Sequence, residues 1–203
     1  MEKIEYKKII IFDFDGVIAH SYSVAFEVAQ LMDANWTIEN HLKLFEGNIT
    51  NYKPSKGVKE IDFDKEVFKR IKRYDLRIYV KEVLEKLAKK HTLIIVSSTS
   101  DYILEYFLKG HKIYDLFDCI LDVNIEKNKT KKFQMIFDKY KCMSEDCLFV
   151  TDTLGDILEA NILDVPTIAI LDGFHNFETL KKGNPIAIIR HFREIFRYSC
   201  YLK

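Results

Sequence analysis

The chain has 203 residues, of which 48% are hydrophobic, and its 31 basic residues balance its 31 acidic residues. This length and composition indicate one globular domain with room for a small inserted unit. A formal net charge of zero gives no reason to expect nucleic acid or an anionic membrane as a partner.

The first predicted element is a strand over residues 8–13, where a short β-branched run is bounded by turn-forming residues. Asp13 and Asp15 follow two apart on extended backbone, so their carboxylates point the same way and repel. A divalent cation relieves that repulsion, and Mg²⁺ accepts one or two carboxylates while leaving room for a phosphate. Gly16 then allows a sharp turn. For this stretch alone, the alternative is an ordinary strand end whose Asp residues cap a helix or lie in water.

The next part of the chain, to about residue 75, has a helical pattern that is too long for a simple crossover between two strands. Helices are predicted over residues 21–33, 38–45 and 63–73. The polar stretch 48–60 contains Pro54 and Gly57 and is predicted to be a loop. We therefore interpret residues 19–75 as an insertion into a core formed by residues 1–18 and 76–203.

After the insertion, strands alternate with helices. Strands are predicted over residues 92–96, 118–123, 147–151, 165–171 and 187–189. Helices are predicted over residues 78–90, 101–108, 130–140, 156–163 and 191–197. This alternation predicts an α/β fold, with right-handed βαβ units and a parallel sheet covered on both faces.

The cysteines and the N-terminal residues indicate where in the cell the protein is expected. The four cysteines, Cys119, Cys142, Cys147 and Cys200, include no C-x-x-C pair, and His and Cys do not cluster at zinc-ligand spacing. We interpret them as reduced thiols of a cytoplasmic protein. No cleavable apolar stretch follows Met1, and no apolar run approaches the roughly 20 residues that a membrane-spanning helix needs.

Polar side chains follow four of the predicted strands, at the sheet edge where parallel α/β proteins bind ligands. In chain order they are Asp13, Asp15, Ser97, Ser98, Lys127, Lys129, Asp152 and Asp156. Acids, hydroxyls and a lysine at one edge form an inventory suited to a metal ion and a phosphate. The sequence therefore predicts a phosphoryl-transfer site there.

Each of these residue types has a role in phosphoryl transfer. Asp13 can attack phosphorus and form an aspartyl-phosphate, and Asp15 can protonate the leaving oxygen and later deprotonate water. Ser97 and Lys129 can bind the phosphoryl oxygens. The expected carboxylates around Mg²⁺ are Asp13, Asp15, Asp152 and Asp156.

Simpler interpretations remain open for several of these residues. Ser97 could begin a turn, and Asp156 could be a helix N-terminal residue that the helix dipole favours. Asp156 could also hold either the waters of the metal or the lysine. Each single lysine of the run 127–132 could lie in solvent.

The motifs together resemble the haloacid dehalogenase superfamily of phosphohydrolases. Asp13-Phe14-Asp15-Gly16-Val17 matches its first motif, Ile94-Ile95-Val96-Ser97 its second, and Val150-Thr151-Asp152-Thr153-Leu154-Gly155-Asp156 its fourth. The resemblance implies a three-layer Rossmann-like core with the first strand central, Mg²⁺ as cofactor, and a small helical cap inserted after that strand.

The chain departs from the family pattern in three places, one of which is the insertion, because it is smaller than many caps of the family. Thr151 stands where Gly is commonest in the family. The lysine of the third motif is either Lys127 or Lys129, and we favour Lys129 because it opens the following helix directly; Lys132 is a distant third choice.

Among the activities of the family, the sequence favours a phosphatase that acts on a small phosphorylated metabolite, similar to phosphoglycolate phosphatases. The alternatives are a sugar phosphomutase, similar to β-phosphoglucomutase, and a catalytically silent binding module. A dehalogenase is disfavoured because dehalogenases lack an acid at the Asp15 position. Expected substrate-binding residues are Gly16, Ser98, Tyr52 and Lys53, the last two in a polar loop suited to a small anionic substrate. We expect a monomer or a homodimer.

Overall fold

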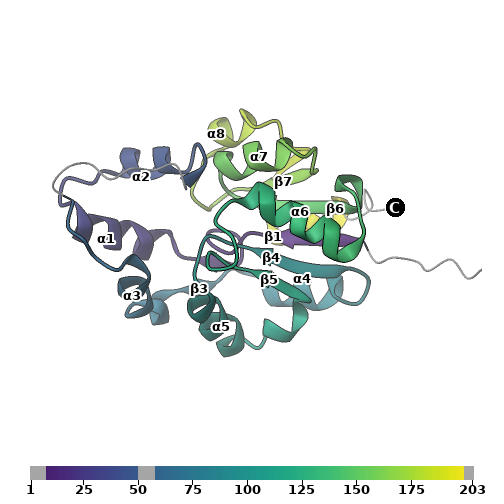
Figure 1. Cartoon of the computed structure of the whole chain (residues 1–203), viewed down its shortest axis with the longest axis horizontal. Coiled ribbons are helices and arrows are strands. Elements are labelled where there is room, and N and C mark those ends of the chain that lie inside the picture. Colours follow the sequence, from purple (N-terminus) through teal and green to yellow (C-terminus); the bar gives the residue numbers. More distant parts are fainter. Residues whose placement is uncertain (1–7, 50–57, 199–203) are drawn as a thin grey trace, which may run out of the picture.

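The computed structural model describes residues 8–49 and 58–198. Its centre is a six-stranded parallel sheet in the order β5–β4–β1–β6–β7–β8 (Figure 1). The strands are β1 (Ile9–Phe12), β4 (Thr92–Val96), β5 (Cys119–Leu121), β6 (Cys147–Thr151), β7 (Thr167–Ile170) and β8 (Ala187–Ile189). The predicted α/β class, with the first strand inside the parallel sheet, is confirmed.

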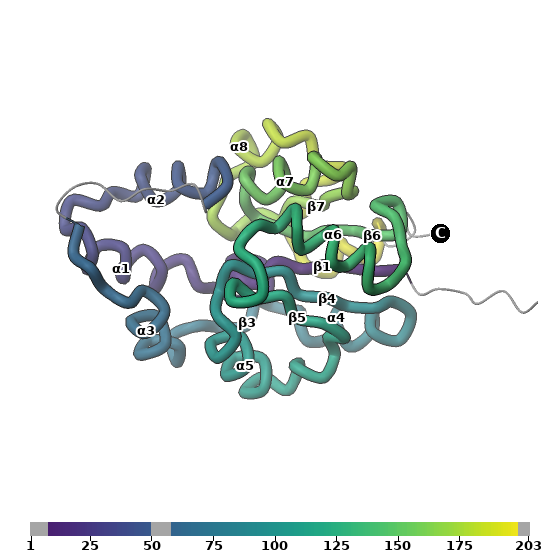
Figure 2. The backbone as a smooth tube through the Cα atoms, viewed as in Figure 1, coloured from purple at the N-terminus to yellow at the C-terminus, as the bar shows by residue number. Residues whose placement is uncertain are grey.

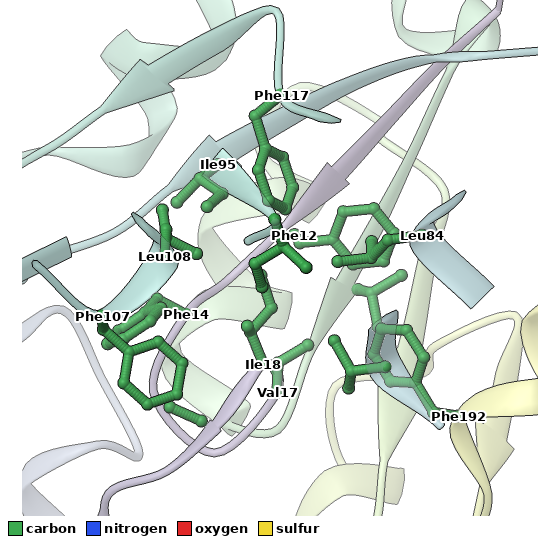
Figure 3. Close-up of a cluster of buried hydrophobic side chains, with 14 of the residues drawn as sticks. Phe12, Phe14, Val17, Ile18, Leu84, Ile95, Phe107, Leu108, Phe117 and Phe192 are labelled. Carbon is green, nitrogen blue, oxygen red and sulfur yellow. The ribbon is translucent and has the colours of Figure 1, made fainter. Parts of the chain in front are cut away.

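Strand β1 is buried on both faces, which explains why its sequence is a continuous apolar run. Ile10 and Phe12 belong to one hydrophobic cluster, and Ile9 and Ile11 belong to another on the opposite face. Figure 3 shows the first cluster, in which the Phe12 ring lies 5.8 Å from the ring of Phe192 between centroids.

Helices cover both faces of the sheet. Buried side chains of α4 (Val80–Leu87), α5 (Asp101–Gly110) and α9 (Ile195–Tyr198) join the Phe12 cluster. On the other face lie α6 (Lys129–Tyr140), α7 (Leu154–Asn161) and α8 (Phe177–Lys181). The arrangement is thus three layers, with helices on either side of the sheet.

A second group of elements lies between β1 and α4, in residues 19–75, which we call the cap segment. It contains α1 (Tyr22–Met32), α2 (Ile38–Leu44) and α3 (Phe63–Phe68). A short antiparallel ribbon of β2 (Ala19–His20) and β3 (Asp75–Leu76) joins its two ends. Figures 1 and 2 show α1, α2 and α3 beyond the end of the sheet to which β1 runs. We keep the boundaries after residue 18 and before residue 76 as a proposed domain division.

Several elements differ from the sequence prediction. The helix predicted over residues 63–73 ends at Phe68, and a separate 3₁₀ turn follows at Ile71–Arg73. The strand predicted over residues 118–123 is shorter because Asp122 Oδ1 accepts the N–H groups of Asn124 and Ile125 and starts a turn. Helix α7 begins two residues before the predicted 156, and neither the β2–β3 ribbon nor α8 was predicted.

The structure also bears on membrane insertion. Within residues 8–49 and 58–198, no helix has the length and apolar character required to cross a membrane.

Candidate active site

Asp13 follows the last residue of β1 and is held by backbone and by charge. Its N–H donates to Val150 O over 2.9 Å, and its Oδ1 accepts the N–H of Phe14 over 2.8 Å. The Nζ of Lys129 lies 3.0 Å from the same Oδ1. Burial, which outweighs the attraction of Lys129, raises the pKa of Asp13 well above its ordinary range. The site therefore places a carboxyl group, with a cation in contact, at the end of a central strand.

Lys129 is the first residue of α6 and is only 4% exposed. Besides Asp13, its Nζ contacts Asp156 Oδ2 at 2.6 Å. Burial acts to lower the pKa of Lys129, but the two carboxylates raise it overall, so the ammonium group stays charged. Lys127, the other candidate, is exposed. The structure thus brings Lys129, and not Lys127, to Asp13.

Asp156 lies in the first turn of α7 and holds this lysine. Its Oδ2 accepts the hydroxyl of Thr151 over 2.6 Å as well as the ammonium of Lys129. Burial acts to raise the pKa of Asp156, but the contacts with Lys129 and Thr151 outweigh it and lower the pKa. Of the roles considered from sequence, the one that the geometry favours for Asp156 is holding the lysine.

Asp15 and Gly16 form the turn that leaves β1. The hydroxyl of Thr99 donates to Asp15 Oδ2 over 2.5 Å, and burial raises the pKa of Asp15. Gly16 has a φ of +70°, and a Cβ there would lie 2.0 Å from Asp152 Oδ2. Glycine is therefore required at residue 16 both by backbone conformation and by the close approach of Asp152.

Asp152 follows β6 and is 0% exposed. Its Oδ2 accepts the N–H of Phe174 over 2.6 Å, but its Oδ1 is buried without a hydrogen-bond donor among the described residues. Burial raises the pKa of Asp152 to about 7. A buried carboxylate oxygen without a partner is costly, and a cation would supply the missing interaction.

The carboxylates fit Mg²⁺ in number and kind, although they form no closed cage. No three His, Cys, Asp or Glu side chains within the described ranges converge closely enough to hold a metal ion by themselves. Mg²⁺ does not need such a cage, because it usually takes one or two carboxylates and completes its shell with water and substrate phosphate.

A cavity of about 50 Å³ lies at this edge of the sheet. Of the residues predicted from sequence, its walls include Asp13, Asp15, Ser98, Lys129 and Asp156. Ser97 is not on this wall: it is fully buried, and its hydroxyl accepts the N–H of Thr99 over 3.0 Å. Tyr52 and Lys53 lie outside the described residues.

Two further basic residues lie at the site: Lys132, the third choice from sequence for the motif lysine, and Arg77, which was not predicted. Lys132, fully buried on α6, donates from Nζ to Ser97 O over 2.5 Å, and burial lowers its pKa to about 8. The guanidinium of Arg77 donates to backbone carbonyls of Gly16 (2.6 Å), Leu171 (2.7 Å) and Asp172 (3.1 Å). Arg77 thereby ties together the two loops that enclose Asp152. An arginine beside β3 carries no sequence signal that distinguishes it from a surface arginine.

Hydrogen bonds join α2 and the turn after it to this edge of the core. The N–H of Gly155 donates to Phe45 O over 2.8 Å, and Asn48 Nδ2 donates to Glu159 Oε1 over 2.8 Å. His175 accepts the N–H of Leu154 at Nδ1, so Nε2 carries the proton and donates to Leu42 O over 2.9 Å. The cap segment therefore contacts the N-terminal part of α7, close to Asp156.

Comparisons with known proteins agree with this arrangement. A family model for haloacid dehalogenase-like hydrolases matches residues 10–170. No curated protein sequence matches the chain.

Solved structures share the fold over nearly their whole length. A predicted phosphatase from Clostridium acetobutylicum is 18% identical, with a TM-score of 0.77 over 97% of this chain and 99% of that one. A predicted phosphoglycolate phosphatase from Haemophilus somnus is 20% identical, with a TM-score of 0.73 over 97% and 99%. CbbY from Rhodobacter sphaeroides, solved in complex with phosphate, is 15% identical, with a TM-score of 0.72 over 90% and 93%. At such identities these structures establish a common fold.

Proposed function

The chain belongs to the haloacid dehalogenase-like hydrolase family, and on that premise we propose that it is a Mg²⁺-dependent phosphatase. Its substrate is a small-molecule phosphomonoester, and hydrolysis proceeds through an aspartyl-phosphate on Asp13. The observation that carries this proposal is the contact between Asp13 and the buried ammonium of Lys129, on the wall of a cavity that Asp15 also lines.

In the first step, the Asp13 carboxylate attacks phosphorus while the bond from phosphorus to the ester oxygen breaks. Asp15, whose pKa is raised by burial, donates a proton to the departing alkoxide. Lys129 offsets the negative charge that develops on the phosphoryl oxygens. The alcohol leaves and the phosphoryl group stays on Asp13.

In the second step, a water molecule attacks the phosphoryl group of Asp13. Asp15 now accepts a proton from that water, which returns the acid to its starting state. Phosphate is released and the Asp13 carboxylate is regenerated. The same two carboxylates thus serve both halves of the reaction.

Bound Mg²⁺ would neutralise part of the charge on the phosphate and on the carboxylates around it. Asp13, Asp15, Asp152 and Asp156 are the candidates to hold it. Because Asp152 Oδ1 has no hydrogen-bond donor within the described part of the chain, we favour Asp152 as one ligand. Asp13, whose contact with Lys129 is through Oδ1, is the second that we favour.

The proposal is tested by hydrolysis of p-nitrophenyl phosphate with MgCl₂ and with EDTA, for wild type and Asp13→Asn. Turnover should require the metal, and the variant should lose at least about 10³-fold in rate because the nucleophile is gone. Circular dichroism checks that the variant is folded. Turnover in EDTA, or a folded variant that keeps more than about a tenth of the rate, would overturn the proposal.

A further inference from the structure

A second and larger cavity, of about 340 Å³, opens beside the catalytic cavity. The two cavities share Asp15, Phe45, Ile49, Ser98 and Phe174 as lining residues. The two cavities are therefore neighbours, and a group attached to a phosphoryl at Asp13 lies next to the larger space. Its volume falls within the range of ordinary small-molecule sites.

The walls of this larger cavity are mostly hydrocarbon. Helix α1 contributes Ala25, Ala29 and Met32, and aromatic rings come from Trp36, Phe45 and Phe174. The rings of Phe45 and Phe174 pack edge to face, with centroids 4.6 Å apart. Such walls favour a ligand that can bury apolar surface.

The charge-bearing side chains among the described lining residues are all acidic. Among the described lining residues there is no Lys or Arg, and the charged ones are Asp15, Asp33 and Asp64. His41 also lines the cavity, but burial lowers its pKa to about 4, so its ring is neutral near pH 7. A second anionic group on the substrate would meet acidic side chains, with no cation among the described lining residues to pair with it.

We propose, building on the phosphatase activity proposed above, that the substrate is the phosphomonoester of an apolar alcohol with an alkyl or aromatic body and no second anionic group. The hydrocarbon part fills the 340 Å³ cavity while the phosphoryl group lies against Asp13 and Lys129. This substrate class differs from the small anionic metabolite that the polar loop at residues 48–53 suggested.

Turnover of n-alkyl phosphates from ethyl to hexyl tests the chain-length dependence. All have the same primary alkoxide leaving group, so the chemistry is constant and the buried apolar area changes. We expect kcat/KM to rise about fourfold per methylene, hence about 250-fold over the four methylenes of the series. Phosphoglycolate, which adds a carboxylate, should fall below ethyl phosphate. A flat or falling series, or a preference for phosphoglycolate, would overturn the inference.

Binding measurements separate this inference from the proposed activity. Trp36 is the one tryptophan of the chain and lines the cavity, so its fluorescence reports occupancy. Alkylphosphonates, whose carbon–phosphorus bond resists hydrolysis, should bind about fourfold more tightly per methylene. Chain-length-dependent binding without turnover of any ester would refute the phosphatase and leave the apolar specificity standing. Turnover and binding without chain-length dependence would refute the apolar specificity alone.

A variant that narrows the cavity tests whether the alkyl chain of the substrate binds there. Ala29→Leu should reduce the hexyl-to-ethyl ratio of kcat/KM by at least about tenfold, because added side-chain volume competes with the longer alkyl chain. Ala34→Leu, in the exposed turn after α1 and not on the cavity wall, is the matched control and should leave the ratio unchanged. Equal ratios in both variants would show that the alkyl chain binds elsewhere.

Discussion

Helix α6 carries two buried lysines near Asp13 and Asp156, and these lysines differ in their surroundings. Lys129 lies between two carboxylates, which raise its pKa, so its charge is constant over the working range of pH. Lys132 donates to a carbonyl oxygen, and burial lowers its pKa to about 8. The first lysine is thus a fixed cation, and the second changes charge at moderately alkaline pH.

Lys129→Met should lower kcat/KM for p-nitrophenyl phosphate by about 10²-fold or more, the scale of losing one donor to the transition state. Lys127→Met is the control, and it should change the rate little because Lys127 is exposed. Steady-state kinetics on both variants measures this. A large loss at Lys127 with none at Lys129 would reverse the assignment.

Lys132 should make stability depend on alkaline pH. Between about pH 8 and about pH 10, the folded protein has lost the Lys132 proton while the unfolded chain keeps it, so the unfolded state binds more protons and stability rises with pH. The free energy of unfolding of wild type, minus that of Lys132→Met, should therefore increase by about 2 kcal/mol over this interval. Urea unfolding at several pH values gives this difference. Lys131→Met, exposed on the same helix, should show no such increase; if it does, Lys132 is not its source.

The acidic residues of the site could be predicted because they follow buried strands, but the residues that bond to the surrounding loops could not. Asp13 and Asp152 each follow a buried strand, which a single sequence can show. Arg77 bonds to carbonyls that lie about 60 and 95 residues away, and no residue-type pattern marks a backbone acceptor. Which serine of the run at residues 97–100 lines the cavity depends on how the chain turns after β4, so the sequence could not separate Ser97 from Ser98.

The ends of the elements were harder to predict than the order of the elements along the chain. The apolar spacing continues from residue 63 to residue 73, yet α3 ends at Phe68. Arg70 explains why the helix ends. In a continuing helix the N–H of Arg70 would donate to Glu66 O, but here it donates to Val67 O. The guanidinium of Arg70 donates to Glu66 O instead, over 2.9 Å. Helix α7 begins early because the Thr153 side chain accepts the Asp156 N–H.

The contact between the cap segment and α7 depends on a glycine. A Cβ on Gly155 would lie 2.2 Å from Gly47 O, so Gly155→Ala should push the two backbones apart and break the bond to Phe45 O. We expect unfolding free energy to fall by about 1–3 kcal/mol and kcat/KM to fall by about tenfold or more, because the cavity walls separate.

Gly110→Ala is the matched control for this prediction. Nothing lies within 4 Å of a Cβ at residue 110, which ends helix α5. Alanine there should be neutral or slightly stabilising, by less than about 1 kcal/mol. Urea unfolding and kinetics on both variants decide the matter: similar effects at the two positions would show that the α7 contact is unimportant.

On the scale of the whole molecule, the architecture followed from alternating strands and helices, since that pattern leaves few ways to bury every apolar face. The apolar character of the larger cavity could not be predicted from that pattern. Its apolar walls come from α1, whose apolar residues a helical pattern assigns only to some buried face, and from Phe174, about 140 residues later. Which faces meet is decided by tertiary packing, so the sequence pointed instead to a polar loop.

The most direct test of the account is detection of phosphate on Asp13 during turnover. Wild-type protein is mixed with p-nitrophenyl phosphate and MgCl₂, quenched in acid within a single turnover, digested and analysed by mass spectrometry. We predict one added phosphoryl group on the peptide that contains Asp13, removed by hydroxylamine as expected for an acyl phosphate. Turnover with no modification of Asp13, or with the phosphoryl group on another residue, would contradict the account.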